Sequence, residues 1–224
     1  MQHFSLTHTF PRVSPIIYGC MGLGGGWDNK ALSADHVKQA HGVIDAALQA
    51  GINCFDHADI YTLGKAERVF GKVLAERPEL RGQMYLQSKC SIRFEDGLGP
   101  KRYDLSGEWV TQSVDGILAR LNTEYLDVLV LHRPDPLMEP EALADALLAL
   151  KNAGKIRHVG VSNMHHHQMA FLQSALDEPL VLNQIDVSLQ QLHWLEEGVY
   201  AGNPEGRDIN FTPGTLEYCR QHGV

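Results

Sequence analysis

The chain has 224 residues and a mass of 24.9 kDa, a length that fits one large domain. Hydrophobic residues make up 44% and charged residues 21%, close to globular averages, which argues against a disordered or collagen-like chain. The formal net charge of −8 argues against broad nucleic-acid binding, which needs a basic surface. No apolar run is long enough for a transmembrane helix, and no signal peptide is visible. We therefore expect a cytoplasmic protein that binds neither nucleic acid nor membrane.

Short apolar runs alternate with amphipathic stretches along the chain. The first element, Gln2–Val13, is interpreted as a short hairpin. The apolar runs predict strands buried on both faces, at Ile16–Met21, Ile52–Phe55, Met84–Gln87, Leu126–Leu131, Arg157–Val161 and Val181–Val187. Apolar residues spaced by three and four predict helices at Asp35–Ala50, Lys65–Ala75, Ser106–Leu121, Pro140–Ala153, His166–Leu176 and Pro213–His222. The segment Gln190–Thr212 is predicted to be a long loop.

Six strand–helix repeats predict an α/β fold with a parallel sheet and right-handed crossovers. Two architectures fit the pattern, an open doubly wound sheet and a (β/α)₈ barrel. A complete barrel needs eight such units in about 250 residues, and this chain shows six. The pattern alone does not separate the two architectures.

The sequence predicts no metal site. His165–His167 are three consecutive histidines, but adjacent residues on a helix point in different directions, so we expect a solvated helix start. Neither an HExxH motif nor a clustered cysteine site is present. Of the four cysteines, Cys20, Cys54 and Cys90 lie in or beside apolar runs and are predicted to be buried thiols.

Three successive predicted strands end in a titratable residue. These residues are Asp56, Lys89 and His132, and Tyr61 follows Asp56 by five positions. Each has an ordinary structural explanation on its own, as a loop cap, a surface lysine, a core histidine or a packed tyrosine. Active sites of parallel α/β folds lie at the carboxyl ends of the strands. Because all four fall at that end, we interpret them together as a site.

These side chains suit proton transfer to a carbonyl oxygen. A tyrosine is a weak acid at neutral pH, and a neighbouring ammonium group favours its phenolate form. A carboxylate beside the lysine keeps the ammonium charged and oriented, and a histidine can donate a hydrogen bond to the substrate oxygen. Tyr61, Lys89, Asp56 and His132 fill these four roles.

The strings that carry these residues resemble the aldo-keto reductase family. They occur in the family's order at its approximate spacing, and they are Gly51–Tyr61, Ser88–Lys89, Leu131–Pro134, Gly160–Asn163 and Asn183–Gln184. Two of the strings, His57–Tyr61 and His132–Met138, look most like the bacterial YdhF-type oxidoreductases. The resemblance covers essentially the whole chain from Ile16 onward.

The resemblance implies an aldo-keto reductase (β/α)₈ barrel, incomplete here at about six of its eight units, in a single domain over residues 1–224. It implies NADPH-dependent reduction of a small-molecule aldehyde or ketone to an alcohol, with the hydride coming from the nicotinamide. Tyr61 would then be the general acid, Lys89 and Asp56 its tuning pair, and His132 the residue that orients the substrate.

The resemblance also assigns cofactor contacts. It implies that Ser162, Asn163 and Gln184 hold the nicotinamide carboxamide. It places the end of the first strand near the ribose or pyrophosphate of the cofactor, through Met21, Gly22 and Leu23.

Members of this family are usually longer than the present chain. The parts that the resemblance places in strands seven and eight carry much of the cofactor-binding surface, including the residues that select NADPH over NADH. Three hypotheses therefore stay open: an NADPH-dependent reductase, a non-catalytic binding module, and an inactive fragment of a reductase. The sequence leaves the physiological substrate, the choice between NADPH and NADH, and the oligomeric state undetermined.

Overall fold

The computed structural model describes residues 5–190, 192, 194 and 214–224. Its main feature is a parallel sheet of six strands. The strands lie side by side in the order in which they occur along the chain. In order across the sheet these are β1 (Tyr18–Gly19), β2 (Cys54–Asp56), β3 (Tyr85–Cys90), β6 (Leu126–Leu131), β7 (Ile156–Ser162) and β8 (Asn183–Gln184).

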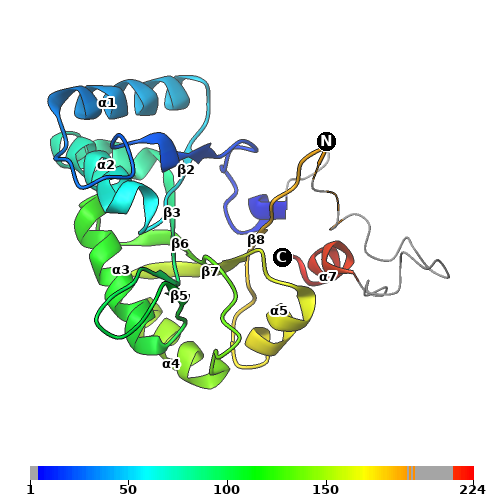
Figure 1. Ribbon diagram of the computed structural model, residues 1–224. Coiled ribbons are helices and arrows are strands. Elements are labelled where there is room, and N and C mark those ends of the chain that lie inside the picture. Colours follow the sequence, from blue (N-terminus) through cyan, green and yellow to red (C-terminus); the bar gives the residue numbers. More distant parts are fainter. Residues whose placement is uncertain (1–4, 191, 193, 195–213) are drawn as a thin grey trace.

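The helices follow one another along an arc outside the curved sheet (Figure 1). They are α1 (Ala34–Gln49), α2 (Lys65–Glu76), α3 (Gly107–Leu121), α4 (Pro140–Asn152), α5 (His166–Gln173) and α7 (Thr215–His222). A doubly wound sheet reverses its strand order and carries helices on both faces, whereas the order here never reverses. The structure is therefore part of a (β/α)₈-type barrel, and the prediction of an incomplete barrel is confirmed.

The helix boundaries follow from local signals. Ser33 precedes α1, and its hydroxyl accepts a hydrogen bond from the His36 N–H at 3.4 Å, while the His36 ring accepts one from the Ser33 N–H at 3.1 Å. Ser106 caps α3 through a single bond, in which its hydroxyl accepts from the Trp109 N–H at 3.3 Å. Asn122 ends α3 in the left-handed conformation, with φ 50°.

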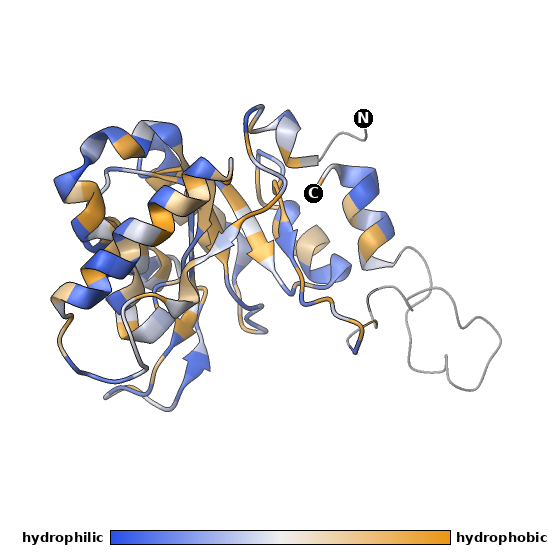
Figure 2. Ribbon diagram, turned by 90° about the horizontal axis from the view of Figure 1, so that it is seen from above, coloured by the Kyte–Doolittle hydropathy of each residue, from blue (hydrophilic) through white to orange (hydrophobic). Residues whose placement is uncertain are grey.

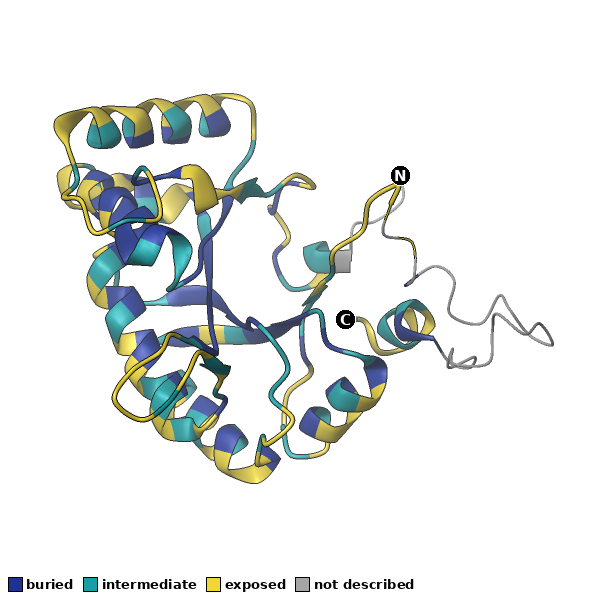
Figure 3. Ribbon diagram, in the orientation of Figure 1, coloured by how far each residue is buried: buried dark blue, intermediate teal, exposed yellow. Residues whose placement is uncertain are grey.

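The sheet separates two buried clusters. Along β6, Leu129 belongs to the large cluster shared with the helices, whereas Val128 and Val130 belong to a small cluster on the other face with Phe10 and Val13. This alternation is the expected period of two for a strand. Both faces are therefore covered, and the strands in the middle of the molecule are buried in Figure 3 and largely orange in Figure 2.

The segment before β1 differs from the prediction. In place of a hairpin it contains a 3-10 helix, η1 (Ser5–His8), and the part of Gln2–Val13 before residue 5 lies outside the described residues. The centroid of the Phe10 ring lies 5.0 Å from that of Tyr85, the first residue of β3, and 5.1 Å from that of His158, the third residue of β7. The segment thus covers the inner face of the sheet near the amino-terminal ends of the strands. It buries its apolar side chains there without pairing as a strand.

Other differences concern the edges of the sheet. Strands β1 and β8 are much shorter than their apolar runs, and β1 passes directly into a 3-10 turn, η2 (Cys20–Gly22). A small antiparallel pair, β4 (Ile92–Arg93) and β5 (Arg102–Tyr103), follows β3 and was not predicted. The predicted loop Gln190–Thr212 lies almost entirely outside the described residues. Among the described helices, none is long and apolar enough to cross a membrane.

The three consecutive histidines do not diverge as expected. His165 precedes α5 and has extended backbone angles (φ −69°, ψ 151°), so it does not follow the helical rotation of the next two residues. His166 is buried, while His167 is exposed. The interpretation of this run as a solvated helix start is therefore wrong for His166. The three predicted buried thiols, in contrast, are buried and free, at Cys20, Cys54 and Cys90.

Candidate active site

The four predicted reactive residues meet at the carboxyl edge of the sheet. Asp56 is the last residue of β2, Lys89 lies one residue before the end of β3, and His132 directly follows β6. Tyr61 begins a 3-10 turn, η3 (Tyr61–Gly64), between β2 and α2. Neighbouring parallel strands β2, β3 and β6 therefore carry three of these side chains to one place.

Lys89 is the centre of this group. Its side chain is 2% exposed, and its Nζ donates to both carboxylate oxygens of Asp56, each at 2.7 Å. The same Nζ lies 3.0 Å from the Tyr61 hydroxyl oxygen and 3.0 Å from the His57 carbonyl oxygen. The ammonium group is thereby fixed between a carboxylate and a phenol.

Asp56 is held by neutral donors as well as by the lysine. The side-chain amide of Gln87 donates to Oδ1 at 2.7 Å, and that of Gln184 donates to Oδ2 at 3.3 Å. A buried carboxylate is tolerated only when charge and hydrogen bonds compensate for lost hydration. Gln184 thus connects the last strand of the sheet to a residue 128 positions earlier.

His132 faces Tyr61 and is neutral at physiological pH. Its ring meets the Tyr61 ring edge-on, with centroids 6.1 Å apart and an interplanar angle of 85°. Burial, followed by the positive charges of Lys89 and Arg133, lowers the pKa of His132 to about 3. A neutral imidazole carries one N–H, so the ring can donate a single hydrogen bond to a substrate oxygen.

The turn that presents Tyr61 has unusual backbone geometry. Thr62 and Leu63 both adopt positive φ, at 47° and 60°, a region that L-residues with branched side chains rarely occupy. The Thr62 hydroxyl donates to the Leu23 carbonyl oxygen at 3.0 Å. This hydrogen bond joins the turn to the segment after β1 and helps to hold the strained conformation beside Tyr61.

A cavity of about 200 Å³ opens above these residues. It brings together three of the predicted reactive residues and all three residues predicted to hold a carboxamide, and its wall consists of Tyr61, Lys89, His132, Arg133, Ser162, Asn163, Gln184, Ile185 and Asp186. Asp56 does not line the cavity, but it forms a hydrogen-bonded ion pair with Lys89, which does. The sequence reasoning missed Arg133, Ile185 and Asp186, although Arg133 directly follows the predicted His132 and the other two directly follow the predicted Gln184.

The far wall of the cavity is rich in amide groups. Asn163 is in the left-handed conformation with φ 50°, and its side-chain amide donates to the Ser162 hydroxyl at 3.1 Å. Its side-chain oxygen accepts from the Asp186 N–H at 3.2 Å. A carboxamide presents one acceptor and one donor group, and the amides and the hydroxyl of this wall offer both complements. The described residues therefore fit the nicotinamide end of a cofactor.

The remaining predicted cofactor residues lie elsewhere. Met21, Gly22 and Leu23 follow β1 at the same edge of the sheet but do not line this cavity. Met21 is 54% exposed, while Leu23 is buried and contacts the Tyr61 turn through its carbonyl oxygen.

Beside the site lies a second buried histidine, His57, whose two ring nitrogens have no hydrogen-bond partner among the described residues. Burial and the charge of Lys89 lower its pKa to about 3. The unfolded chain binds a proton at this residue below pH about 6.5, and the folded chain does not. The contribution of His57 to the free energy of unfolding is therefore fully present above pH 6.5. It decreases as the pH falls from 6.5 toward 3.

We expect His57→Leu to reduce the loss of unfolding free energy that occurs as the pH falls from 7 to 5. At pH 5 the wild-type chain should lose about 2 kcal/mol at His57 relative to pH 7, and the variant should lose none of this amount. Urea unfolding at pH 5 and pH 7 measures the difference, with His8→Gln at an exposed position as the control. Parallel losses in the wild type and in His57→Leu contradict the expectation.

Comparison with known proteins agrees with this geometry. The sequence profile described as "Aldo/keto reductase family" matches residues 15–224. The chain belongs to the aldo/keto reductase family. It is 43% identical over 186 residues to the uncharacterized oxidoreductase YcsN of Bacillus subtilis, a match that covers 81% of this chain and 57% of that protein. The oxidoreductase YdhF of Escherichia coli is 40% identical over 192 residues, covering 84% of this chain and 61% of its own length.

The fold agrees with solved members of the aldo/keto reductase family. The glycerol dehydrogenase AKR11B4 from Gluconobacter oxydans superposes with a TM-score of 0.70 at 26% identity, covering 95% of this chain and 58% of that one. The chain thus spans roughly three fifths of the length of these relatives. The predicted resemblance to the family and to its YdhF-type members is confirmed.

Proposed function

We propose that this chain carries the proton-transfer centre of an NADPH-dependent reductase that converts aldehydes or ketones to alcohols. The observation that supports the proposal most strongly is the position of the Lys89 Nζ, 2.7 Å from Asp56 and 3.0 Å from the Tyr61 hydroxyl. The cavity above this pair also contains the amide-rich wall formed by Ser162, Asn163 and Gln184. Oxidoreductase activity is the known character of the family, whereas the cofactor and substrate are our assignment.

Each side chain has one role in this proposal. Tyr61 donates the proton of its hydroxyl to the carbonyl oxygen of the substrate. Lys89 stabilises the phenolate that remains, and Asp56 keeps the ammonium in place. The neutral imidazole of His132 donates a hydrogen bond to the same carbonyl oxygen. When bound, NADPH supplies the hydride that adds to the carbonyl carbon, and solvent returns a proton to Tyr61.

The choice of NADPH rests on the family resemblance. Ser162, Asn163 and Gln184 would hold the carboxamide, and Met21, Gly22 and Leu23 would lie along the more distant part of the cofactor. The buried free thiols of Cys20, Cys54 and Cys90 support a reducing compartment, and we assign the protein to the cytoplasm.

Tyr61→Phe tests the proposal. The variant removes the transferable proton and keeps the ring, so we expect carbonyl-dependent oxidation of NADPH to fall about 10²–10⁴-fold. A panel of aldehydes and ketones serves as substrate, and a fluorescence titration gives the Kd for NADPH, which should stay unchanged. Tyr103→Phe, at an exposed tyrosine of β5, is the matched control.

Three outcomes separate the hypotheses. Full activity of Tyr61→Phe contradicts the assigned acid. Saturable NADPH binding by the wild-type chain without turnover on any carbonyl compound favours a non-catalytic binding module. Absence of both NADPH binding and turnover favours an inactive fragment of a reductase. In a chain that unfolds cooperatively, this outcome also contradicts the assignment of cofactor contacts to the described cavity.

A further inference from the structure

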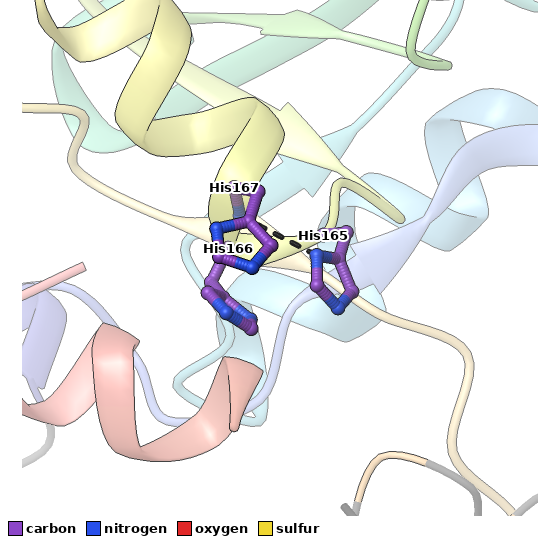
Figure 4. A group of neighbouring side chains, drawn as sticks. All are labelled: His165, His166 and His167. Carbon is purple, nitrogen blue, oxygen red and sulfur yellow. Dashed lines mark hydrogen bonds between the residues drawn. The ribbon is translucent and has the colours of Figure 1, made fainter. Parts of the chain in front are cut away.

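Three imidazole rings gather at the start of α5, outside the site described above (Figure 4). The ring of His166 has its centroid 4.1 Å from those of both His165 and His167, and the latter two are 5.3 Å apart. One ring nitrogen from each residue lies within 4.8 Å of the others. Of the residues that the structure describes, these three form the only such group of three or more candidate metal ligands.

We propose that His165, His166 and His167 bind one Zn²⁺ ion, with a fourth position open to water. Imidazole nitrogen is a preferred zinc ligand. Zn–N distances of about 2.0–2.1 Å in a tetrahedral site place the ligand nitrogens about 3.4 Å apart. The three nitrogens therefore have to approach one another by roughly 1.4 Å at most, which rotation of the side chains provides.

The backbone explains how consecutive residues converge. His165 lies before the helix with ψ 151°, whereas His166 and His167 are its first two residues. A run of three residues within a helix spreads its side chains around the axis. The extended residue at the first position folds its ring back toward the other two, and Figure 4 shows the three rings as one group.

A second residue supports His166 as a ligand. Its side chain is buried, and its Nδ1 lies 3.4 Å from the Thr215 hydroxyl oxygen, which is also buried, at the start of α7. Histidine ligands commonly donate their other ring N–H to a nearby oxygen, which fixes the ring and its tautomer. With Nδ1–H directed at Thr215, Nε2 is the ring nitrogen that would coordinate the metal.

Two features of the described residues oppose Zn²⁺ binding and lower the affinity of the site for the ion. The His165 Nδ1 accepts a hydrogen bond from the His167 N–H at 3.4 Å, which metal binding has to replace. This bond is long and therefore weak. The amino-terminal end of α5 also carries partial positive charge, which disfavours a cation. Three nitrogen ligands outweigh both, and we expect binding in the micromolar range rather than tighter.

Zinc binding to the whole purified chain tests the site, with neither NADPH nor a carbonyl compound present. We expect one equivalent of Zn²⁺ to bind saturably, and Co²⁺ in its place to give the visible spectrum of tetrahedral coordination. His165→Asn combined with His167→Gln should weaken Zn²⁺ binding at least 100-fold, because asparagine keeps the helix cap and only the ligands are lost. The control His8→Gln removes an exposed histidine elsewhere and should bind like the wild type.

The proposal is overturned if the wild-type chain shows no saturable Zn²⁺ binding, or if the double variant binds Zn²⁺ as tightly as the wild type. Should the double variant fail to fold, His167→Gln alone changes only an exposed residue and should weaken binding at least 10-fold. Unchanged affinity in that single variant also overturns the proposal. As a second readout, Zn²⁺ should raise the Tm of the wild type and of His8→Gln, but not that of the His165/His167 variant.

Discussion

Lys89→Met is expected to lower the free energy of unfolding by about 3–5 kcal/mol, since it leaves a buried carboxylate without its countercharge. The Asp56 carboxylate is 7% exposed, and both of its oxygens lie 2.7 Å from the Lys89 Nζ. For a chain of this size the change corresponds to a drop in Tm of roughly 6–20 °C. Carbonyl reduction should be lost as well, because the Tyr61 hydroxyl loses the ammonium 3.0 Å away.

A double variant separates these two effects. Asp56→Asn combined with Lys89→Met removes the stranded charge, while the Asn oxygen still accepts from the Gln87 amide, so most of the stability should return. Activity should not return. Lys155→Met, which breaks an exposed ion pair with Asp115, should cost less than about 1 kcal/mol. Urea unfolding measures all three variants. Equal stability of Lys89→Met and the wild type contradicts the expectation.

The order of elements and the edge of the sheet that carries the site were predictable. Apolar runs and caps located the central strands and the first four helices to within a few residues, since these signals are local. Placing Asp56, Lys89 and His132 at strand ends was enough to predict that they meet, because parallel strands end at one edge.

Features that depend on tertiary contacts were not predictable. The segment Gln2–Val13 was expected to form a hairpin. Only its position on the inner face of the sheet explains why Phe10 and Val13 pack against the strands instead. The left-handed turn at Thr62 and Leu63 contradicts the preference of both residue types and is held by a hydrogen bond to Leu23.

The contacts of Gln184 in the cavity wall and the grouping of His165–His167 were not predictable from the sequence either. The Gln184 amide reaches Asp56 across the sheet, a contact between residues far apart in sequence. Helical spacing rules placed His165–His167 apart, whereas the extended backbone of His165 brings the three rings together. Local rules fail at these positions because the chain there adopts a conformation that its neighbours determine.

Gly71→Ala is expected to destabilise the chain by at least about 3 kcal/mol, because a methyl group there collides with backbone. A Cβ at Gly71 would lie 2.1 Å from the Arg120 carbonyl oxygen and 2.8 Å from the Leu121 carbonyl carbon. Both atoms belong to the last turn of α3, which cannot move aside as a flexible side chain can. Helices α2 and α3 would therefore have to separate, and their contact is part of the large buried cluster.

Gly42→Ala gives the matched control for this close packing. Gly42 also lies within a helix, α1, and nothing approaches within 4 Å of a Cβ built there. The same substitution should stabilise the chain by about 0.5–1 kcal/mol, because alanine favours the helix more than glycine does. Thermal unfolding of both variants then separates helix propensity from packing. A Gly71→Ala variant with wild-type Tm would show that α2 and α3 are less closely packed than the structure indicates, and the barrel wall beside the Tyr61 turn would be correspondingly looser.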